Sequence, residues 1–327
     1  MRILIIKLSS LGDIIHTLPC LSILREAFPN AHIDWVTEEL GASLLSGHPY
    51  IDNVIIYKRY IWPSYLKRVM WLRLINEVRA FLKDLRRQYD IVLDFQGLLK
   101  SGIITALAKG KREIGFKGKE FNYLFLKEKV PVNYNEHAVI RYLRLIEYLG
   151  IPIRKIEFPL PYNHKKWDIP KPFVVISPLA RWESKLWFKE RWIALTKELE
   201  KIGYKVVFIG SMKDEDYIGD ICRDIPSAIN LSGKTSLKEL ACLYREATLT
   251  ISVDTGPMHL AAAVGTPVIA LFGPTDPNRT GPFGGGHRVI YHSLPCQPCL
   301  KRYCPTRLCL KAIEVEEVVS AVKEILG

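Results

Sequence analysis

Residues 248–277, TLTISVDTGPMHLAAAVGTPVIALFGPTDP, contain two apolar, β-rich runs, each followed by polar and small residues. The first run, 249–253, turns sharply at 254–256 into a short helix over 258–264, and Pro257 suits the first turn of that helix. The second run, 268–272, ends in the loop GPTDP. Free N–H groups and the helix dipole favour anions where a parallel strand ends and a helix begins. The stretch therefore predicts an α/β sheet with a phosphate-sugar site at its edge.

The same alternation of strand and helix runs through the chain in two rounds, with helical stretches such as 16–27 and 69–87 between the early strands. Expected strands lie at 3–7, 32–36, 53–57, 91–95, 173–177, 205–209, 228–231, 249–253 and 268–272. The fold class is therefore α/β, with two Rossmann-like, doubly wound parallel-sheet domains facing a central cleft.

A Pro-rich segment without apolar periodicity, residues 158–172, separates the two rounds. We expect one domain over 1–160, a linker over 161–171 and a second domain over 172–327. The last helix, 313–326, has two open placements, on the second domain or back on the first.

The composition is that of a folded protein: 327 residues, 48% of them hydrophobic. The sequence contains no uninterrupted run of about 18 apolar residues, so we expect no transmembrane helix. The start, RILIIKL, is typical of a buried strand rather than a signal peptide, so we expect a cytoplasmic protein.

Positive charge is concentrated in residues 58–90, which hold nine Lys or Arg and three Asp or Glu in a chain of net charge +12. Such a block attracts phosphates of nucleic acid, lipid or substrate, although a solvated helix face is equally compatible with the charge alone. Large apolar residues such as Trp62, Trp71 and Leu72 are interleaved with the basic ones. This mixture favours an interfacial helix on an anionic membrane surface. No nucleic-acid-binding motif and no GxGxxG dinucleotide fingerprint is present.

The loop after the first strand combines Lys7, Ser9, Ser10, Gly12 and Asp13. Its small residues leave backbone N–H groups accessible at the crevice end of the sheet. For Asp13 two interpretations are open, a helix N-cap and a base in the cleft.

The corresponding loop of the second round carries Arg181 and Lys185. Both cations are well placed to neutralise a diphosphate, and solvated surface charge is the alternative. Further along, Ser236 to Glu239 is typical of a capping box that opens a helix.

Four cysteines near the C-terminus have the spacing C-x2-C-x4-C-x4-C. In a reducing compartment, structural zinc and free thiols are the competing interpretations. The four are Cys296, Cys299, Cys304 and Cys309.

Taken together, these segments resemble glycosyltransferase family nine and, within it, the heptosyltransferase I branch. The resemblance spans nearly the whole chain in order. Its motifs are RILIIKLSSLGDIIHTLP at 2–19, DWVTEE at 34–39, DFQGLLKS at 94–101, EHAVIRY at 136–142, KLW at 185–187, KTSLKELA at 234–241, SVDTGPMHLAAA at 252–263 and FGPTDP at 272–277.

The resemblance implies a GT-B fold and an inverting transfer of L-glycero-D-manno-heptose from ADP-heptose to Kdo of Kdo–lipid A, with no cofactor and no catalytic metal. It makes Asp13 the base, Lys185 the phosphate-binding lysine and Asp254 the residue that holds heptose hydroxyls. The remaining donor-binding residues that it implies are Lys7, Ser9, Ser10, Gly12, Arg181, Thr235, Leu237, Thr255, Gly256 and His259.

For the acceptor, the resemblance and the basic segment together imply a site at the inner face of the inner membrane. The acceptor-binding residues are Lys58, Arg59, Gln96, Lys117 and Lys119. The alternatives are another family-nine transferase, such as one of the heptosyltransferase II type or one that uses a different nucleotide sugar, and a non-catalytic nucleic-acid-binding protein.

Overall fold

The computed structural model describes residues 1–118, 120–161 and 165–327, and the chain divides into two compact units, Met1–Pro161 and Tyr162–Gly327. Each unit is built on one six-stranded, all-parallel sheet with its own hydrophobic core. The boundary lies at the start of the expected linker. The later part of that linker belongs to the second unit, where Lys165 and Lys171 pair with Glu239 and Glu246.

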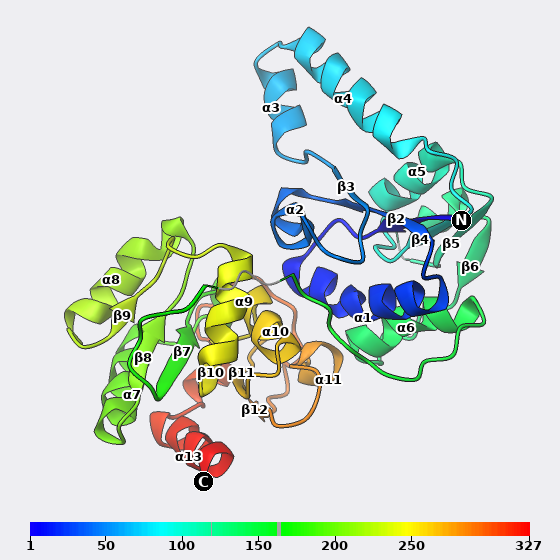
Figure 1. The fold of residues 1–327 in the computed structure, drawn as a ribbon. Coiled ribbons are helices and arrows are strands. Elements are labelled where there is room, and N and C mark those ends of the chain that lie inside the picture. Colours follow the sequence, from blue (N-terminus) through cyan, green and yellow to red (C-terminus); the bar gives the residue numbers. More distant parts are fainter. Residues whose placement is uncertain (119, 162–164) are drawn as a thin grey trace. The chain divides into compact units, whose positions relative to one another are not determined.

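The sheet of the first unit has the order β3-β2-β1-β4-β5-β6, so the first strand lies at its centre. Helices cover the sheet, and α1 packs beside α6 (Figure 1). The elements are β1 (Arg2–Ile6), α1 (Leu11–Ala27), β2 (His32–Thr37), α2 (Glu39–Leu45), β3 (Asn53–Ile56), α3 (Ile61–Lys67), α4 (Trp71–Leu85), β4 (Ile91–Asp94), α5 (Leu99–Ala108), β5 (Arg112–Phe116), β6 (Glu128–Val130) and α6 (Ala138–Tyr148).

The second sheet, β12-β11-β10-β7-β8-β9, repeats this order, because the first strand of the unit, β7, again pairs with the second and the fourth. Both sheets thus have the doubly wound Rossmann order. The elements are β7 (Phe173–Ser177), α7 (Lys189–Lys201), β8 (Lys205–Phe208), α8 (Glu215–Arg223), β9 (Ile229–Asn230), α9 (Leu237–Glu246), β10 (Leu249–Val253), α10 (Gly256–Ala263), β11 (Val268–Leu271), α11 (Pro277–Thr280), β12 (Arg288–Ile290), α12 (Leu308–Lys311) and α13 (Val315–Leu326).

All nine expected strands are present, and the sequence patterns missed β5, β6 and β12. These three carry charged residues in short apolar runs, and two of them are edge strands of three residues each, which need only one neighbour. Helix α1 begins at Leu11, five residues before the expected start at 16.

The last helix, α13, is part of the second unit. Its residues Val315, Val318, Ala321 and Val322 are buried in the core of that unit, and the helix packs against α7. The structure thus has the last helix packed on the second domain.

Helices α3 and α4 form a hairpin that extends away from the first sheet (Figure 1). The hairpin is fixed at its base, where Trp62 and Phe81 pack against Tyr57 in an aromatic cluster. Toward its turn it leaves large apolar side chains in solvent, since Val69 is 70% exposed and Leu72 is 79% exposed.

Candidate active site

The loop between β1 and α1 is held at the carboxyl end of the first sheet by residues at the end of the neighbouring strand β4 and just after it. The Gln96 side-chain oxygen accepts hydrogen bonds from the backbone N–H groups of Leu8 and Ser9, at 3.0 and 3.1 Å. The buried carboxylate of Asp94 in turn accepts bonds from the N–H groups of Gln96 and Gly97. The position of the first loop is therefore set by β4, which pairs directly with β1.

Asp13 lies in the first turn of α1, three residues after the cap Ser10. Its Oδ2 accepts hydrogen bonds from the Ser10 N–H (3.2 Å) and hydroxyl (2.8 Å). Asp13 is therefore not the N-cap that one interpretation of the sequence suggested. It is the reciprocal partner in a capping box, and its other oxygen is directed elsewhere.

The second carboxylate oxygen of Asp13 meets Tyr142 of α6. The Tyr142 hydroxyl donates to Asp13 Oδ1 at 2.7 Å and accepts from Lys7 Nζ, also at 2.7 Å. Lys7 Nζ lies 4.0 Å from the same oxygen and donates to the Phe95 carbonyl. Tyr142 thus bridges a buried lysine and a partly exposed carboxylate.

The electrostatics of this bridge keep Asp13 ionised. Burial alone would raise the pKa of Asp13, but Lys7, the Tyr142 hydrogen bond, His16 and Ser10 together hold that pKa well below its usual range. Burial lowers the pKa of Lys7 and raises that of Tyr142. At neutral pH the site therefore presents a carboxylate that can accept a proton from a bound hydroxyl group.

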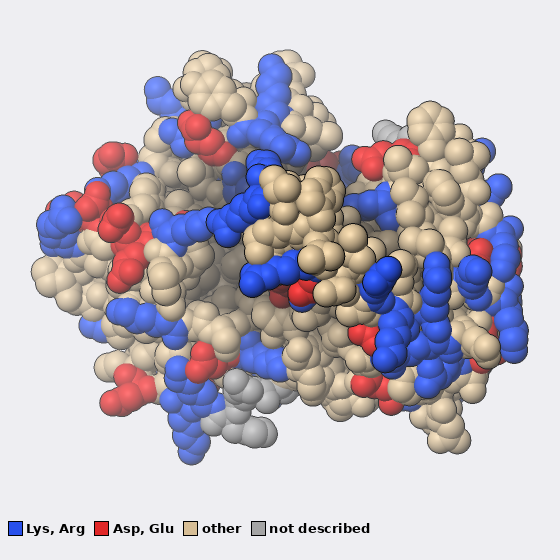
Figure 2. Space-filling model, turned by 90° about the horizontal axis from the view of Figure 1, so that it is seen from above, with Lys and Arg blue, Asp and Glu red and all other residues tan. Residues whose placement is uncertain are grey.

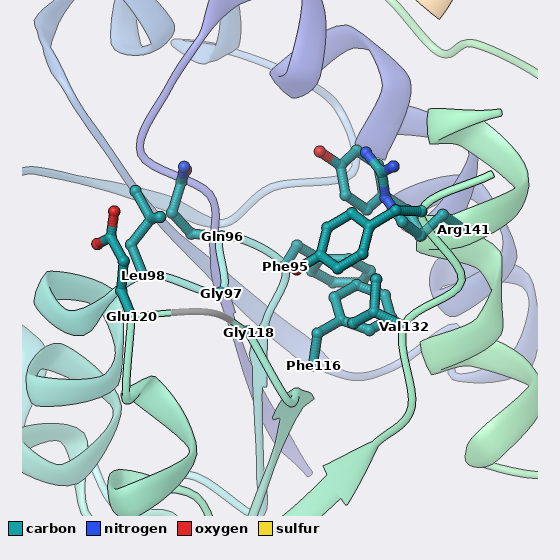
Figure 3. Close-up of a pocket in the computed structure, with 11 residues that line it drawn as sticks. Phe95, Gln96, Gly97, Leu98, Phe116, Gly118, Glu120, Val132 and Arg141 are labelled. Atoms are coloured by element: carbon teal, nitrogen blue, oxygen red, sulfur yellow. The ribbon is translucent and has the colours of Figure 1, made fainter. Parts of the chain in front are cut away.

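A pocket of about 270 Å³ opens beside this bridge in the first unit. Aromatic and apolar side chains, Phe95, Phe116 and Val132, form much of its wall, and Arg141 and Glu120 lie at opposite sides of it (Figure 3). Tyr142 belongs to the same wall, so the pocket and the Asp13 bridge share a residue.

In the second unit, three polar residues meet where β7, β10 and β11 end. Lys185 follows β7, Asp254 follows β10 and Thr275 follows β11. Lys185 Nζ donates to Asp254 Oδ2 at 2.6 Å, and the Thr275 hydroxyl donates to the same oxygen at 2.6 Å. The ammonium also lies 4.8 Å from the centre of the Trp182 ring. Because adjacent parallel strands end at the same edge, the register of the sheet brings these residues together.

Next to this cluster, Thr255 and Gly256 begin helix α10, with Thr255 as N-cap. The N–H groups of a first helical turn are available to an anion. His259 is buried one turn further along α10.

Helix α9 packs beside α10. It starts at Leu237, directly after Thr235 and the cap Ser236. The expected capping box is confirmed, since Ser236 accepts a bond from the Glu239 N–H. Arg181 is exposed in the loop after β7.

The acceptor-binding residues expected from the sequence are dispersed over the first unit. Lys58 pairs with Glu77 at 2.6 Å, and Arg59 lies 3.5 Å from the buried Glu38, which Lys100 also contacts. The Lys117 ammonium lies 5.7 Å from the centre of the Tyr123 ring. The oxygen of Gln96 is directed at the first loop, and Lys119 lies outside the described residues.

The four C-terminal cysteines remain free thiols, with Cys309 buried and Cys296 exposed. Among the described residues, which include all four, no three His, Cys, Asp or Glu side chains are grouped to hold a metal ion. No helix among the described residues has both the length and the apolar character that crossing a bilayer requires.

Sequence reasoning missed Tyr142 and Thr275 as members of these sites. Thr275 had a usable signal, because it lies in the loop after a predicted strand next to the one that carries Asp254. Tyr142 ends the family motif at 136–142, but the motif does not show its contact, because Tyr142 lies inside α6 and meets Asp13 only through the packing of α6 on α1.

Two doubly wound, all-parallel units with polar residues at the carboxyl edge of each sheet have the architecture of the GT-B class. The chain belongs to glycosyltransferase family 9 (heptosyltransferase), whose family model matches residues 78–309. It is therefore an enzyme, and the alternative of a non-catalytic nucleic-acid-binding protein is disfavoured.

The chain is 32% identical to lipopolysaccharide heptosyltransferase 1 of Pseudomonas aeruginosa over 322 residues, which cover 93% of this chain and 87% of the relative. Solved structures of E. coli heptosyltransferase WaaC are also similar. The structure with ADP has a TM-score of 0.82 at 28% identity and covers 99% of this chain and 100% of that one. The structure with ADP-2-deoxy-2-fluoro heptose has a TM-score of 0.79 at 28% identity and covers 99% of each chain.

Proposed function

We propose that this enzyme transfers L-glycero-D-manno-heptose from ADP-heptose to a Kdo residue of Kdo–lipid A, in synthesis of the lipopolysaccharide inner core. The similarity to lipopolysaccharide heptosyltransferase 1 and to a WaaC structure with an ADP-heptose analogue supports the donor and the sugar. The observation that carries the chemistry is the Asp13 carboxylate, held ionised by Lys7 and Tyr142 at the end of β1.

In the proposed reaction, a Kdo hydroxyl attacks the anomeric carbon of heptose while Asp13 accepts its proton. The bond between that carbon and the diphosphate oxygen breaks, and ADP leaves with the electron pair. Because attack and departure are on opposite faces, the anomeric configuration inverts. Hydrogen bonds from Ser10 fix Oδ2 of Asp13. The proton would therefore be accepted by Oδ1, the oxygen that is bonded to Tyr142.

The donor half of the reaction is assigned to the second unit. Lys185 and the N–H groups at Thr255 and Gly256 would stabilise the negative charge that grows on the diphosphate. Asp254 and Thr275 would contact heptose hydroxyls, with His259 one turn along. Thr235 and Leu237 at the start of α9 would contact adenosine. Arg181, which is exposed in the same loop as Lys185, would add a second positive charge for the diphosphate.

We also propose that the α3–α4 hairpin rests on the anionic inner face of the inner membrane. It combines the exposed apolar residues Val69, Trp71 and Leu72 with the basic block 58–90. The face in Figure 2 shows Lys and Arg side chains gathered among uncharged ones. Lys58, Arg59, Lys117 and Lys119 would then contact the phosphates of the lipid acceptor.

A panel of donors and acceptors with mass detection tests the transfer. ADP-heptose with Kdo–lipid A should give a product heavier by one heptose, and the same donor with lipid A that lacks Kdo should give none. Preferred transfer from another nucleotide sugar, or heptosylation only of an acceptor that already carries heptose, would contradict the proposal and favour another family-nine activity.

A further inference from the structure

A long loop of the second unit, residues 294–307, runs between β12 and α12 and contacts the residues around the donor cluster. The backbone N–H of Leu300 in this loop donates to the Pro274 carbonyl at 3.0 Å. Pro274 directly precedes Thr275, whose hydroxyl donates to Asp254. The 294–307 loop therefore supports the segment that holds the carboxylate of the cluster.

The same loop holds the turn that carries Lys185. Ser184, the residue directly before the lysine, is only 1% exposed. Its hydroxyl donates to the Lys301 carbonyl at 2.6 Å, and its backbone N–H donates to the Arg302 carbonyl at 3.2 Å. The hydroxyl bond joins residues that are 117 positions apart in the chain. The turn is therefore fixed by tertiary contact as well as by local structure.

Arg307, at the end of the loop, contacts the residue that follows the lysine. Its guanidinium group donates to the Leu186 carbonyl at 3.0 Å. The central carbon of the same group lies 4.7 Å from the centre of the Phe188 ring, so the arginine is itself held in place by stacking. The residues on both sides of Lys185 in the chain are thus bonded to the 294–307 loop.

The loop also contacts the ring over which the Lys185 ammonium lies. That ammonium is 2.6 Å from Asp254 and 4.8 Å from the centre of the Trp182 ring. The guanidinium carbon of Arg302 lies 5.7 Å from the centre of the same ring. A lysine side chain is long and flexible, and a fixed backbone reduces the conformational entropy that it loses when it binds a ligand.

We propose that Ser184 and Arg307 are positioning residues, which hold the Lys185 turn on the 294–307 loop so that the ammonium meets the diphosphate. This inference rests on the proposed function, because it takes Lys185 as the residue that binds the diphosphate. Ser184 and Arg307 act on the donor only through the lysine. Loss of either contact leaves the charge of Lys185 intact and changes where that charge lies.

The first test is the affinity for ADP, measured by calorimetric titration. Ser184→Ala should weaken ADP binding by about three- to tenfold, the loss expected for one hydrogen bond. Arg307→Met should weaken it to a similar extent, and Arg307→Lys should recover part of the affinity, because lysine keeps a donor and a positive charge. Unchanged ADP affinity in both Ser184→Ala and Arg307→Met would overturn the proposal.

A double-mutant cycle distinguishes an effect through Lys185 from an independent one. In the Lys185→Gln background, Ser184→Ala should change the affinity for ADP by less than about twofold. The same loss in both backgrounds would overturn the proposal, since the serine would then act without the lysine.

Thr196→Val is the matched control. Thr196 is also buried in the second unit, and its hydroxyl donates to a backbone carbonyl, that of Trp192, at 2.8 Å within α7. The variant should lower the melting temperature about as much as Ser184→Ala does and leave the affinity for ADP at the wild-type value. A loss of ADP affinity equal to that of Ser184→Ala would overturn the positioning role, because any buried hydroxyl would then have the same effect.

A measurement without ADP separates this inference from the proposed function. Reductive methylation, quantified at Lys185 by mass spectrometry, reports how often the amine leaves Asp254. Faster methylation of Lys185 in Ser184→Ala and Arg307→Met than in wild type and Thr196→Val would support the positioning role, even in an enzyme that binds no ADP and transfers no heptose. Equal rates in all four proteins would overturn it, even if transfer from ADP-heptose occurs.

Discussion

At the scale of single residues, the two carboxylate oxygens of Asp13 have different hydrogen-bond partners. Asp13 Oδ2 closes a capping box with Ser10, and Oδ1 is bonded to Tyr142. A capping residue has a fixed side-chain conformation, so its second oxygen is oriented before any substrate binds.

Replacement of Asp13 by Asn should remove transfer while leaving ADP-heptose binding within about twofold of wild type. The amide has nearly the same shape but cannot accept the proton of the attacking hydroxyl, which contributes a factor of about 10² to 10⁴ in rate. Single-turnover kinetics and calorimetric titration of the donor measure the two quantities. Near-normal turnover in this variant would refute the base assignment.

Tyr142→Phe should move the acidic limb of the kcat/KM profile to higher pH. The tyrosine donates to the charged form of Asp13, so its removal makes that form less stable and raises the pKa of the carboxyl group. The group must be ionised to act as a base, so activity is then lost at a higher pH as the solution is acidified.

The control for Tyr142→Phe is Tyr148→Phe, which changes an exposed tyrosine at the end of the same helix. Its pH profile should coincide with that of wild type. A Tyr142→Phe profile that falls in amplitude without moving along the pH axis would contradict a role for the tyrosine in setting the charge of Asp13.

At the scale of elements, the α3–α4 hairpin is stabilised at one end and exposed at the other. The aromatic cluster at its base anchors it, so the apolar residues near its turn do not contribute to the core. Changes at the turn should therefore affect association with other surfaces more than the free energy of unfolding.

Changing Trp71 and Leu72 together to Ser should weaken binding to vesicles that contain anionic lipid by about tenfold or more, with the melting temperature nearly unchanged. The two side chains are 54% and 79% exposed and would contact the lipid interface. Vesicle flotation at several salt concentrations measures the effect. Met212→Ser, at a residue 74% exposed in the second unit, is the matched control and should bind as wild type. Failure of the wild-type protein to bind at low salt would refute the membrane proposal.

The elements also explain what sequence patterns predict. Central strands such as β1 and β10 are buried on both faces and form continuous apolar runs, which made them visible. Edge strands such as β6 and β12 have three residues and include charged ones, so no run exists to detect. Asp254 directly follows a strand, and Asp13 and Lys185 lie in the segments that lead from a strand into the next helix, so the strand pattern marked all three positions and the resemblance to family nine supplied their roles. Tyr142 and Arg141 belong to a helix interior, where only tertiary packing reveals what they contact.

At the scale of the whole molecule, each unit has its own buried core, so each should respond to ligands of its own site. ADP at 100 times its dissociation constant should stabilise the second unit by about 2.7 kcal/mol. Differential scanning calorimetry should show one transition that rises with ADP and is unaffected by it in Lys185→Gln. Equal stabilisation of that variant would contradict the role of Lys185 at the diphosphate.

The contact between Lys185 and Asp254 has a consequence for selectivity. Without a ligand the lysine already has an internal counterion, and Thr275 holds that counterion in place. A lone phosphate ion must compete with a carboxylate that is covalently tethered nearby, which keeps its occupancy low at cellular concentrations. In the donor site proposed above, a nucleotide that carries a hydroxylated sugar would compensate both partners at once, because its diphosphate would meet the lysine and its hydroxyl groups the carboxylate. The ion pair would then favour the complete donor over its fragments.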